Sequence, residues 1–381
     1  MVGSKTLLPP AVLKIEILYL IQSYNMSRQF ESGIKATYKH QGVKYFPFNS
    51  EPGTSYVLTS DPWAYLRAWI DQQINSTQGD KKKRLTKAKY FAEQAESFQI
   101  AAEKTRLPTK ATLTYYSLLN LTKGFLSVKG LELEKKEESH GISLGNNSDE
   151  LTVLGPLKNC TNIFLEFSKH LGKPIQGKHK VNISDVICDI PEIHELGFTL
   201  GKISQRKYLP VTIDFLTNDD KTKIFTELSF RKENDARLQI EKFYKNNRKK
   251  YFKLRDTEEN GDSIYRSIKR KNYTHDNFPR IYKNICKEYK ELDISILLTR
   301  DGYKYYVNLK PNAYHQLANL LMMAFYMGSL ARYRPTKTQE ILGGEMYPLI
   351  TEIIDTCPRQ FLYKIVSLTT ESVCAVPKAK I

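Results

Sequence analysis

Polar side chains interrupt a mostly apolar helical pattern in the stretch YYSLLNLTKG, and their types are those used in acid–base and phosphate chemistry. Tyr116, Asn120 and Lys123 stand at i, i+4 and i+7, so we expect them to share one face of a helix. A buried amide or ammonium group is costly without a partner, and the next loop supplies a candidate partner in His140. That histidine is either a general acid or base near neutral pH or a structural donor that holds the loop. In the structural alternative, Asn120 caps a loop carbonyl and Lys123 extends to solvent.

Two arginines, Arg332 and Arg334, stand at the end of a second, strongly apolar helical pattern. Their guanidinium groups can clamp a phosphate, or they can neutralise the carbonyl groups at the end of the helix. We predict a candidate catalytic group in which His140 acts as base or acid, Arg332 stabilises developing negative charge and Asn120 orients the phosphate or the histidine. Lys123 and Arg334 are the predicted phosphate contacts beside it.

The chain is basic, with 58 lysine and arginine residues against 41 acidic residues and a formal charge of +17. Such an excess favours polyanionic partners, although a lysine- and tyrosine-rich composition is also typical of an AT-rich genome. The stretch KFYKNNRKKYFKLRD, followed by SIKRKNY, mixes cations with aromatic rings that can stack on bases. The alternative is a solvated helix face whose aromatic residues point to the core. The predicted nucleic-acid contacts in this region are Arg248, Lys249, Lys250, Lys269, Arg270 and Lys271.

Several common motifs are missing from the chain. We find no phosphate-binding P-loop, no dinucleotide-binding glycine motif, no serine nucleophile elbow and no paired histidines at zinc-binding spacing. The five cysteines are scattered without a C-x-x-C pair, which indicates reduced thiols. The apolar run from Leu317 to Leu330 is shorter than the roughly 20 residues that span a membrane. We therefore predict a cytoplasmic protein with no metal, no cofactor and no membrane association. Its expected partners are RNA or DNA and other proteins, and it could also form a homo-oligomer.

Three helices are predicted in the first third of the chain. SDPWAYLRAWIDQQI begins with capping residues and a proline, and its apolar side chains recur at helical spacing. NSTQGDKKKR then reads as a polar linker before a helix through AKYFAEQAESFQIAAEKT. A third helix is expected from Thr109 to about Gly130. Short joints between consecutive helices predict an antiparallel bundle.

The middle of the chain is β-rich. YLPVTIDFL, KIFTELSF and ISILLTRDGYKYYVNL predict strands, and Asp301-Gly302 predicts a hairpin turn. One short helix is expected in SDVICDIPEIHELG, between a cap at Ser184 and a stop at Gly197, and another over 233–247.

The helical pattern then returns. NAYHQLANLLMMAFYMGSLARY predicts a buried central helix. MYPLITEIIDTCPRQFLYKIVSLTTES predicts one helix or two split near Cys357-Pro358. The predicted fold class is α+β, mainly a helical bundle with an inserted mixed α+β region. The predicted division is an N-terminal segment (1–60), a helical bundle in two parts (61–130 and 311–381) and an α+β insertion between them (131–310).

Several stretches together resemble the bacterial YaaC-like protein family. They are SFQIAAEKTRLPTKATLTYYSLLNLTKGFL, SHG, SDVICDIPEIHELG, GSLARYRPTKTQEIL and PRQFLYKIVS. The helix followed by His140-Gly141 also resembles the HEPN superfamily of helical bundles, which includes ribonucleases of toxin and antiviral systems with an R-x(4–6)-H motif. Neither Arg332 nor Arg334 is followed by a histidine at that spacing. The resemblance implies a nucleic-acid-associated component of a defence or stress system, with its catalytic motif absent or rebuilt around His140. The alternative is a non-catalytic binding or assembly subunit of a multiprotein complex.

Overall fold

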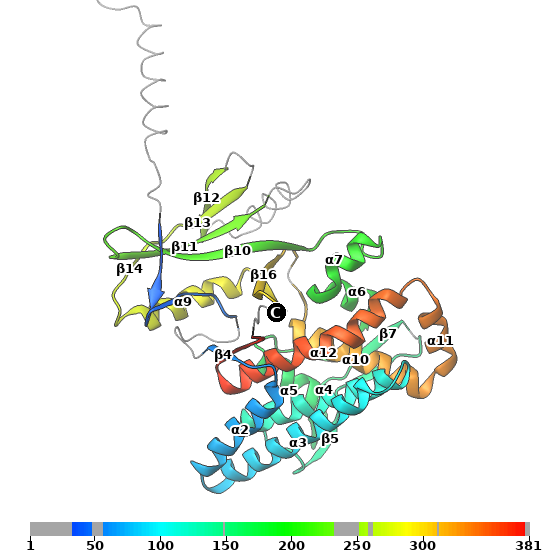
Figure 1. The fold of residues 1–381 in the computed structure, drawn as a ribbon. Coiled ribbons are helices and arrows are strands. Elements are labelled where there is room, and N and C mark those ends of the chain that lie inside the picture. Colours follow the sequence, from blue (N-terminus) through cyan, green and yellow to red (C-terminus); the bar gives the residue numbers. More distant parts are fainter. Residues whose placement is uncertain are drawn as a thin grey trace, which may run out of the picture.

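The protein is built from two layers, an antiparallel sheet with one covering helix and a second layer of packed helices (Figure 1). The α+β class predicted from the sequence is confirmed. These layers come from a computed structural model, which describes residues 33–47, 56–147, 149–231, 251–257, 262–310 and 312–377.

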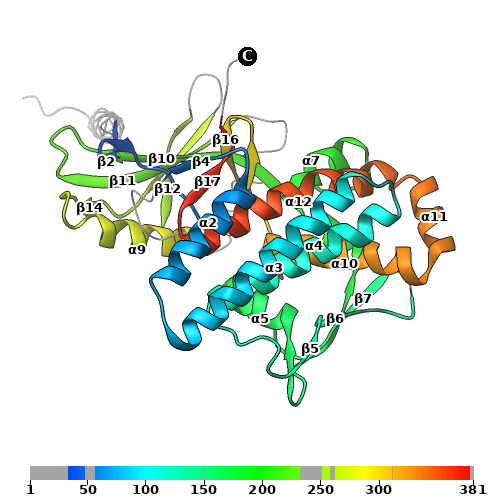
Figure 2. The ribbon, with the colours of Figure 1, turned by 60° about the horizontal axis from the view of Figure 1, so that its bottom comes forward.

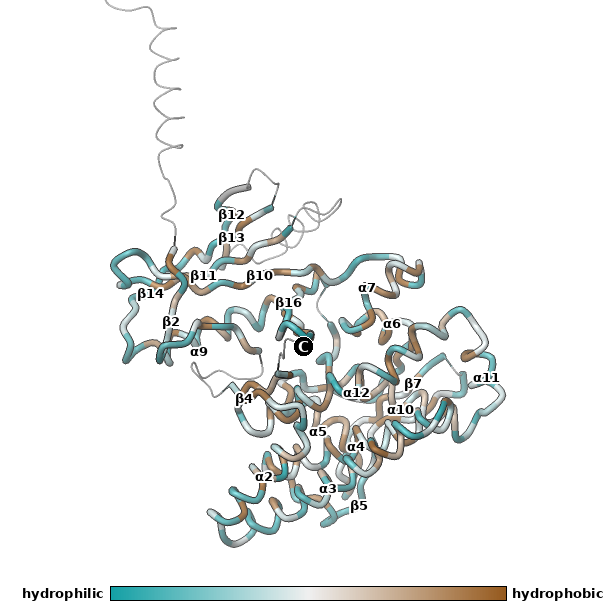
Figure 3. The backbone as a smooth tube through the Cα atoms, viewed as in Figure 1, coloured by the Kyte–Doolittle hydropathy of each residue, from teal (hydrophilic) through white to brown (hydrophobic). Residues whose placement is uncertain are grey.

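Three helices from the first third of the chain form one side of the helical layer (Figure 2). They are α2 (Pro62–Asn75), α3 (Gly79–Glu103) and α4 (Thr109–Val128), as the apolar periodicity predicted. Asp61 caps α2, because its Oδ1 accepts a hydrogen bond from the Ala64 amide at 3.0 Å. The predicted linker NSTQGDKKKR was too long, since α3 already begins at Gly79 and takes in the following lysines. Lysine and arginine are good helix formers, and much of α2 and α3 is hydrophilic on the solvent side (Figure 3).

The second part of the helical layer comes from the C-terminal third of the chain. It consists of α10 (Gln316–Tyr333), α11 (Pro335–Gly343) and α12 (Tyr347–Thr370). Every residue of α10 from Gln316 to Leu330 is buried, which confirms the predicted central helix. The sequence left one helix or two open near Pro358, and the structure has one, because α12 continues through the proline. Cys357, Pro358 and Phe361 are all buried, so packing outweighs the cost of a proline inside a helix, about 3 kcal/mol.

The other layer is an antiparallel sheet. Its main strands, in spatial order, are β12 (Phe252–Thr257), β13 (Ser263–Ser267), β11 (Lys223–Phe230), β10 (Tyr208–Thr217), β16 (Gly302–Asn308) and β15 (Ile294–Thr299). The short strands β1 (Ile34–Lys35) and β14 (Lys271–Asn272) pair with β10 and β11. The predicted hairpin at Asp301-Gly302 joins β15 to β16. Helix α9 (Phe278–Lys290) packs its apolar side against the sheet.

Two glutamines of the helical layer cover the free edge of β15. Gln316 accepts from the Ile296 amide at 3.1 Å and donates to its carbonyl at 3.2 Å. Gln360 pairs with Leu298 in the same way, at 2.9 and 2.6 Å. These side chains occupy the backbone groups that an exposed sheet edge would offer to another strand, and they join the two layers.

Short strands and helices link the layers between residues 131 and 200. The strands are β5 (Glu137–Ser139), β6 (Ile142–Leu144), β7 (Glu150–Val153), β8 (Cys160–Asn162) and β9 (His179–Asn182), and the helices are α5 (Ile163–His170), α6 (Ile183–Cys188) and α7 (Pro191–Thr199). β5 pairs with β8, and β7 pairs with both β6 and β9. Near the chain ends, β2 (Thr37–Tyr38) pairs with β3 (Gln41–Gly42), and β4 (Tyr56–Leu58) with β17 (Val373–Ala375).

The single helix predicted in SDVICDIPEIHELG is two helices, α6 and α7. Pro191 disfavours a helical conformation at the residue before it, so α6 ends at Cys188 and α7 begins at the proline. The cap of α6 is Asn182 rather than Ser184, since its Oδ1 accepts from the Ser184 amide at 2.9 Å. Gly197 lies inside α7 and does not end it.

Some predictions lie outside the described residues or stay untested. The helix expected over 233–247 and the contacts Arg248, Lys249 and Lys250 lie outside the described residues. The domain bounds and a HEPN-like arrangement of the helices stay predictions. Among the described residues, no helix is long and apolar enough to cross a membrane.

Candidate functional site

Two adjacent tyrosines of α4 hold the two groups that the sequence proposed for chemistry. The Tyr115 hydroxyl lies 2.7 Å from His140 Nδ1, and the Tyr116 hydroxyl accepts from an Arg332 terminal nitrogen at 2.5 Å. Successive side chains of a helix are about 100° apart, so the two hydroxyls reach different neighbours. His140 and Arg332 still meet at one ring, because the Tyr115 ring centroid is 5.7 Å from the His140 ring centroid and 5.8 Å from the Arg332 guanidinium carbon.

The turn after β5 fixes the position of His140. Gly141 has a φ of +82°, and a Cβ on it would lie 1.9 Å from Asn162 Oδ1, so this close approach requires glycine. Asn162 caps α5 by accepting from the Leu165 amide at 3.0 Å. Its Nδ2 donates to the Leu154 carbonyl at 3.1 Å. The histidine therefore stands on a turn that is locked to the start of the next helix.

Lys123 and Glu138 form an ion pair that holds the same loop against α4. Lys123 Nζ lies 2.7 Å from Glu138 Oε2, and their side chains are 19% and 16% exposed. The ammonium group also lies 5.5 Å from the centre of the Phe91 ring. Lys123 is thus partnered within the protein and does not simply extend to solvent.

The electrostatics of the site favour a neutral imidazole. Burial lowers the pKa of His140, the nearby charges of Lys123 and Arg332 lower it further, and Glu138 acts in the opposite direction. Burial also raises the pKa of Tyr115, so its hydroxyl stays protonated. His140 is half-buried, and among the described residues no hydrogen-bond partner is found for its Nε2. A neutral imidazole with one nitrogen oriented by tyrosine and the other free can exchange a proton with a ligand.

Arg332 is held in place but is not saturated. Its Nε donates to the Gly328 carbonyl at 3.0 Å, and one terminal nitrogen bonds Tyr116. The other terminal nitrogen lies 3.5 Å from Ser329 Oγ. A guanidinium group has five N–H donors, so donors remain for an anion. The group is half-buried at the end of α10.

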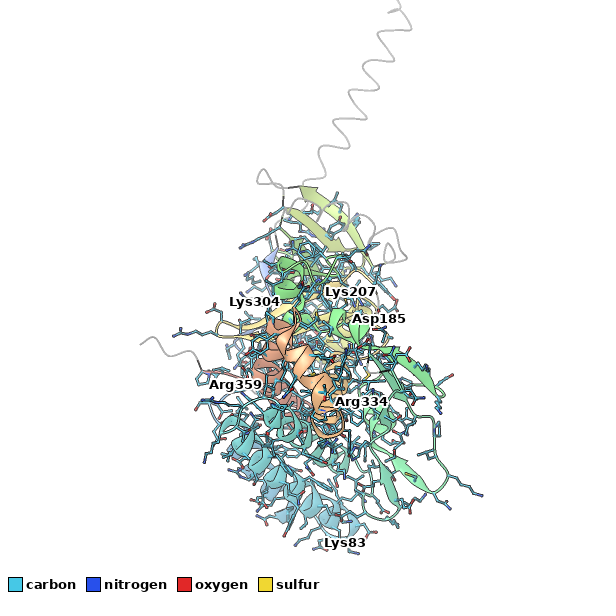
Figure 4. All side chains as sticks on the ribbon, turned by 90° about the vertical axis from the view of Figure 1, so that its right-hand side faces the viewer. Lys83, Asp185, Lys207, Lys304, Arg334 and Arg359 are labelled. Carbon is cyan, nitrogen blue, oxygen red and sulfur yellow. The ribbon has the colours of Figure 1, made fainter. Side chains whose placement is uncertain are left out.

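Arg334 has a different set of partners. Its two terminal nitrogens donate to the carbonyls of Gly145 at 2.8 Å and Asn146 at 3.3 Å. It lies at the corner between α10 and α11, and Figure 4 shows it below Asp185 of α6 and Lys207. Arg334 therefore bonds carbonyl groups of another loop and holds that loop against the end of the central helix.

The structure does not bring every predicted residue to this site. Asn120 is buried and donates to the Tyr116 carbonyl of its own helix at 2.8 Å, with no recorded bond to His140 or Arg332 among the described residues. Lys269 and Arg270 lie between β13 and β14, and Lys271 is the first residue of β14. There Lys271 pairs with Glu288 at 2.8 Å, and Arg270 lies over the Phe225 ring at 5.4 Å.

Sequence reasoning missed the orienting partner Tyr115 and the loop anion Glu138. The only signal for Tyr115 is its place beside Tyr116, and Glu138 stands in an acidic-basic run that also suits a solvated turn. It also missed the fully buried pair of Lys364 and Glu192, 2.6 Å apart. A lysine among the apolar residues of α12 was the available signal for that pair.

The described residues include no group of three or more histidine, cysteine, aspartate or glutamate side chains able to hold a metal ion. The side chains that meet at the Tyr115 ring and its neighbour Tyr116 are an imidazole, a guanidinium group and two phenols.

Comparison with known proteins identifies one family. The family model described as YaaC-like Protein matches residues 46–369, which is most of the chain. A search of the curated proteins and a search of the solved structures find no match.

Proposed function

The chain belongs to the YaaC-like protein family, and we propose that it is a nucleic-acid-associated protein whose His140–Arg332 site cleaves RNA without a metal ion. The observation that supports this proposal most is the sharing of the Tyr115 ring by a neutral imidazole and a guanidinium group. One can move a proton and the other can stabilise negative charge, which are the two needs of phosphodiester transfer.

In the proposed step, the ribose 2′-hydroxyl attacks the neighbouring phosphorus. His140 Nε2 takes the hydroxyl proton, the P–O bond to the 5′-oxygen of the next nucleotide breaks, and a 2′,3′-cyclic phosphate forms. The leaving oxygen gains a proton from water or from the imidazolium. The free donors of Arg332 stabilise the charge that develops on the phosphorane oxygens. Tyr115 and Tyr116 are positioning residues, since they act through His140 and Arg332.

The remaining predicted residues have narrower roles in this proposal. Asn120 supports α4 below Tyr116, and Lys123 and Arg334 hold the loops on either side of the site. Phosphate contact by either cation would require it to exchange a protein partner. A HEPN-like bundle, a role in defence or stress, protein partners and a cytoplasmic location belong to the same proposal.

The test is cleavage of end-labelled RNA by purified protein in the presence of a metal chelator. We expect wild type to produce 2′,3′-cyclic phosphate ends and His140→Ala to lose about 10²–10⁴-fold in rate, with a comparable loss for Arg332→Ala. His170→Ala is the matched control, because this exposed histidine bonds only the Glu166 carbonyl of its own helix among the described residues. Cleavage at equal rates by all four proteins, or none by wild type, would refute the proposed site.

A non-catalytic assembly subunit is the second candidate, and the loop contacts of Arg334 and Lys123 favour it. In that case the polar cluster only fastens loops to the helices. Wild type would then leave RNA intact, and Arg334→Ala would lower the melting temperature and weaken any self-association measured by sedimentation.

A further inference from the structure

Helix α9 carries a row of exposed cations on the face that points away from the sheet. Arg280, Lys283, Lys287 and Lys290 are exposed and follow one another at i, i+3, i+7 and i+10. This spacing places them along one side of the helix over about 15 Å, at 1.5 Å per residue. The opposite side is buried against the sheet through Phe278, Ile281, Tyr282, Ile285, Cys286 and Tyr289. The apolar side thus fixes the direction in which the cations point.

No acidic side chain neutralises this row within the part of the chain that the structure describes. Glu288 of the same helix is paired with Lys271 at 2.8 Å, and Glu291 accepts from the Tyr251 hydroxyl at 2.6 Å. None of the four cations forms an ion pair with a described residue. Half-buried lysines of the helical layer are paired instead, since Lys89 lies 2.8 Å from Asp71 and Lys87 lies 3.0 Å from Glu134. The α9 row is therefore concentrated charge without an internal counterion.

We propose that the α9 row binds the phosphodiester backbone of a nucleic acid; this inference rests on the nucleic-acid association proposed above and assigns it a surface. Unpaired lysine and arginine side chains release condensed counterions when they neutralise phosphates, and this release drives binding. The row offers no base-reading arrangement, so its binding is independent of sequence.

A membrane surface fits the row less well. A helix that lies in a bilayer interface inserts an apolar face into the lipid, and the apolar face of α9 is already buried against β10 and β11. The exposed residues between the cations are polar, as at Asn284. Figure 1 shows α9 under the sheet at the end opposite α7 and α11, so a backbone bound there adds a contact surface separate from the His140–Arg332 site.

The salt dependence of binding tests this surface. Fluorescence anisotropy of labelled single-stranded RNA, titrated between about 50 and 200 mM salt, gives the slope of log K against log salt. All proteins carry His140→Ala so that the RNA stays intact. We expect Lys283→Gln with Lys287→Gln to make the slope shallower by about 1.4, or about 0.7 per lost phosphate contact. The change in slope should be larger on duplex DNA, at about 0.9 per contact.

The matched control is Lys81→Gln with Lys82→Gln. These lysines are exposed at the start of α3, have no described ion pair, and give the same change in net charge. Equal slopes in the two double variants, no RNA binding by the parent protein, or binding only to anionic lipid vesicles would overturn the inference. If wild type cleaves RNA and His140→Ala does not, but the two double variants have equal slopes, the catalytic proposal holds without the α9 surface. If wild type does not cleave RNA but the slopes of the two double variants differ, the α9 surface holds and the catalytic proposal fails.

Discussion

At the scale of single residues, Tyr115 does the most to define the candidate site. Its ring is shared by His140 and Arg332, and its hydroxyl bonds Nδ1 of the imidazole. The hydroxyl of the neighbouring Tyr116 accepts a hydrogen bond from Arg332 and so holds the guanidinium group. Two phenols of one helix therefore place an acid–base group and a cation side by side.

We predict that Tyr115→Phe frees the imidazole without emptying the core. The ring stays, but the bond to Nδ1 is lost, so the free energy of unfolding falls by only about 1 kcal/mol. The tautomer preference of His140 weakens, which nitrogen chemical shifts of histidine-labelled protein can measure. Tyr116→Phe is the control and leaves those shifts in place, because Tyr116 bonds Arg332. Unchanged shifts in Tyr115→Phe would show that the hydroxyl does not orient the imidazole.

A second histidine, His194, makes stability depend on pH. Its Nε2 accepts from the Lys207 amide at 2.9 Å, which requires the neutral ring, and burial lowers its pKa to about 4. The unfolded chain binds this proton near pH 6.5, so stability is lost as the pH falls from about 6.5 to about 4. The expected loss is about 3 kcal/mol over this window.

His194→Gln tests whether His194 causes this pH dependence of stability. The glutamine amide oxygen can accept the same hydrogen bond, but the amide does not titrate. Urea unfolding at pH 7 and pH 4.5 should show a smaller difference for this variant than for wild type. The same difference in both proteins would assign the pH dependence to other groups.

Side-chain chemistry in the sequence predicted part of this site. The expectation that the helix of Tyr116 and Lys123 meets the loop of His140 and the helix end of Arg332 agrees with the contacts. It did not identify Tyr115 as the partner, and it gave Asn120 a place in the chemistry that no recorded contact supports. Spacing along one helix shows which residues share a face, but the partner across a tertiary contact depends on how the two elements pack.

At the scale of elements, the crossing of α4 and α10 controls the geometry of the site, because one helix carries the tyrosines and the other carries Arg332. The helices approach closely at Gly328. A Cβ there would lie 3.1 Å from the Tyr115 Cβ and 3.3 Å from the Ala111 carbonyl oxygen. The Gly328 carbonyl also accepts from Arg332. A small residue at this crossing thus positions both candidate groups.

We predict that Gly328→Val separates the two helices and lowers the free energy of unfolding by about 1–3 kcal/mol through overpacking. Urea denaturation measures this change. Gly343→Ala is the control, because no atom of a described residue lies within 4 Å of a Cβ at this last residue of α11, so the change should be near neutral. Equal stability of the two variants would mean that the crossing tolerates a larger spacing.

Elements were predictable where one physical signal dominated. The cap and apolar stripe of α2, the uniform burial of α10 and the Asp301-Gly302 hairpin were all visible in the sequence. The sequence could not decide between one helix and two at Pro358, because burial of its neighbours, which only the fold reveals, outweighs the local preference for a break. The α6–α7 segment was misread for the opposite reason, since Pro191 begins a helix there and the local rule holds.

At the scale of the whole molecule, buried polar groups join the two layers. Gln316 and Gln360 pair with the edge strand β15, and Lys364 of α12 pairs with Glu192 of α7 in complete burial. Asn319 of α10 donates to the Asp189 carbonyl between α6 and α7 at 3.0 Å. Such contacts between elements far apart in sequence have no local signature, so sequence reasoning could predict both layers but not their junction.

The buried ion pair gives the sharpest test of that junction. Removing one partner leaves an uncompensated charge in the core, and Glu192 Oε2 already lacks a hydrogen-bond partner among the described residues. We predict that Lys364→Met lowers the free energy of unfolding by about 3–5 kcal/mol. Glu192→Leu should cost a similar amount, because it strands the lysine.

The double variant Lys364→Met with Glu192→Leu should recover most of that loss, since two apolar side chains of similar size replace the pair without burying a charge. Urea denaturation of the four proteins gives the double-mutant cycle, and the coupling free energy is the quantity that decides. Additive losses would mean that Lys364 and Glu192 do not depend on each other, and that the layers are held mainly by the glutamine contacts to β15. A large coupling means that removing either charge destabilises the junction of α7 with α12, while the helical layer keeps the apolar core around α10.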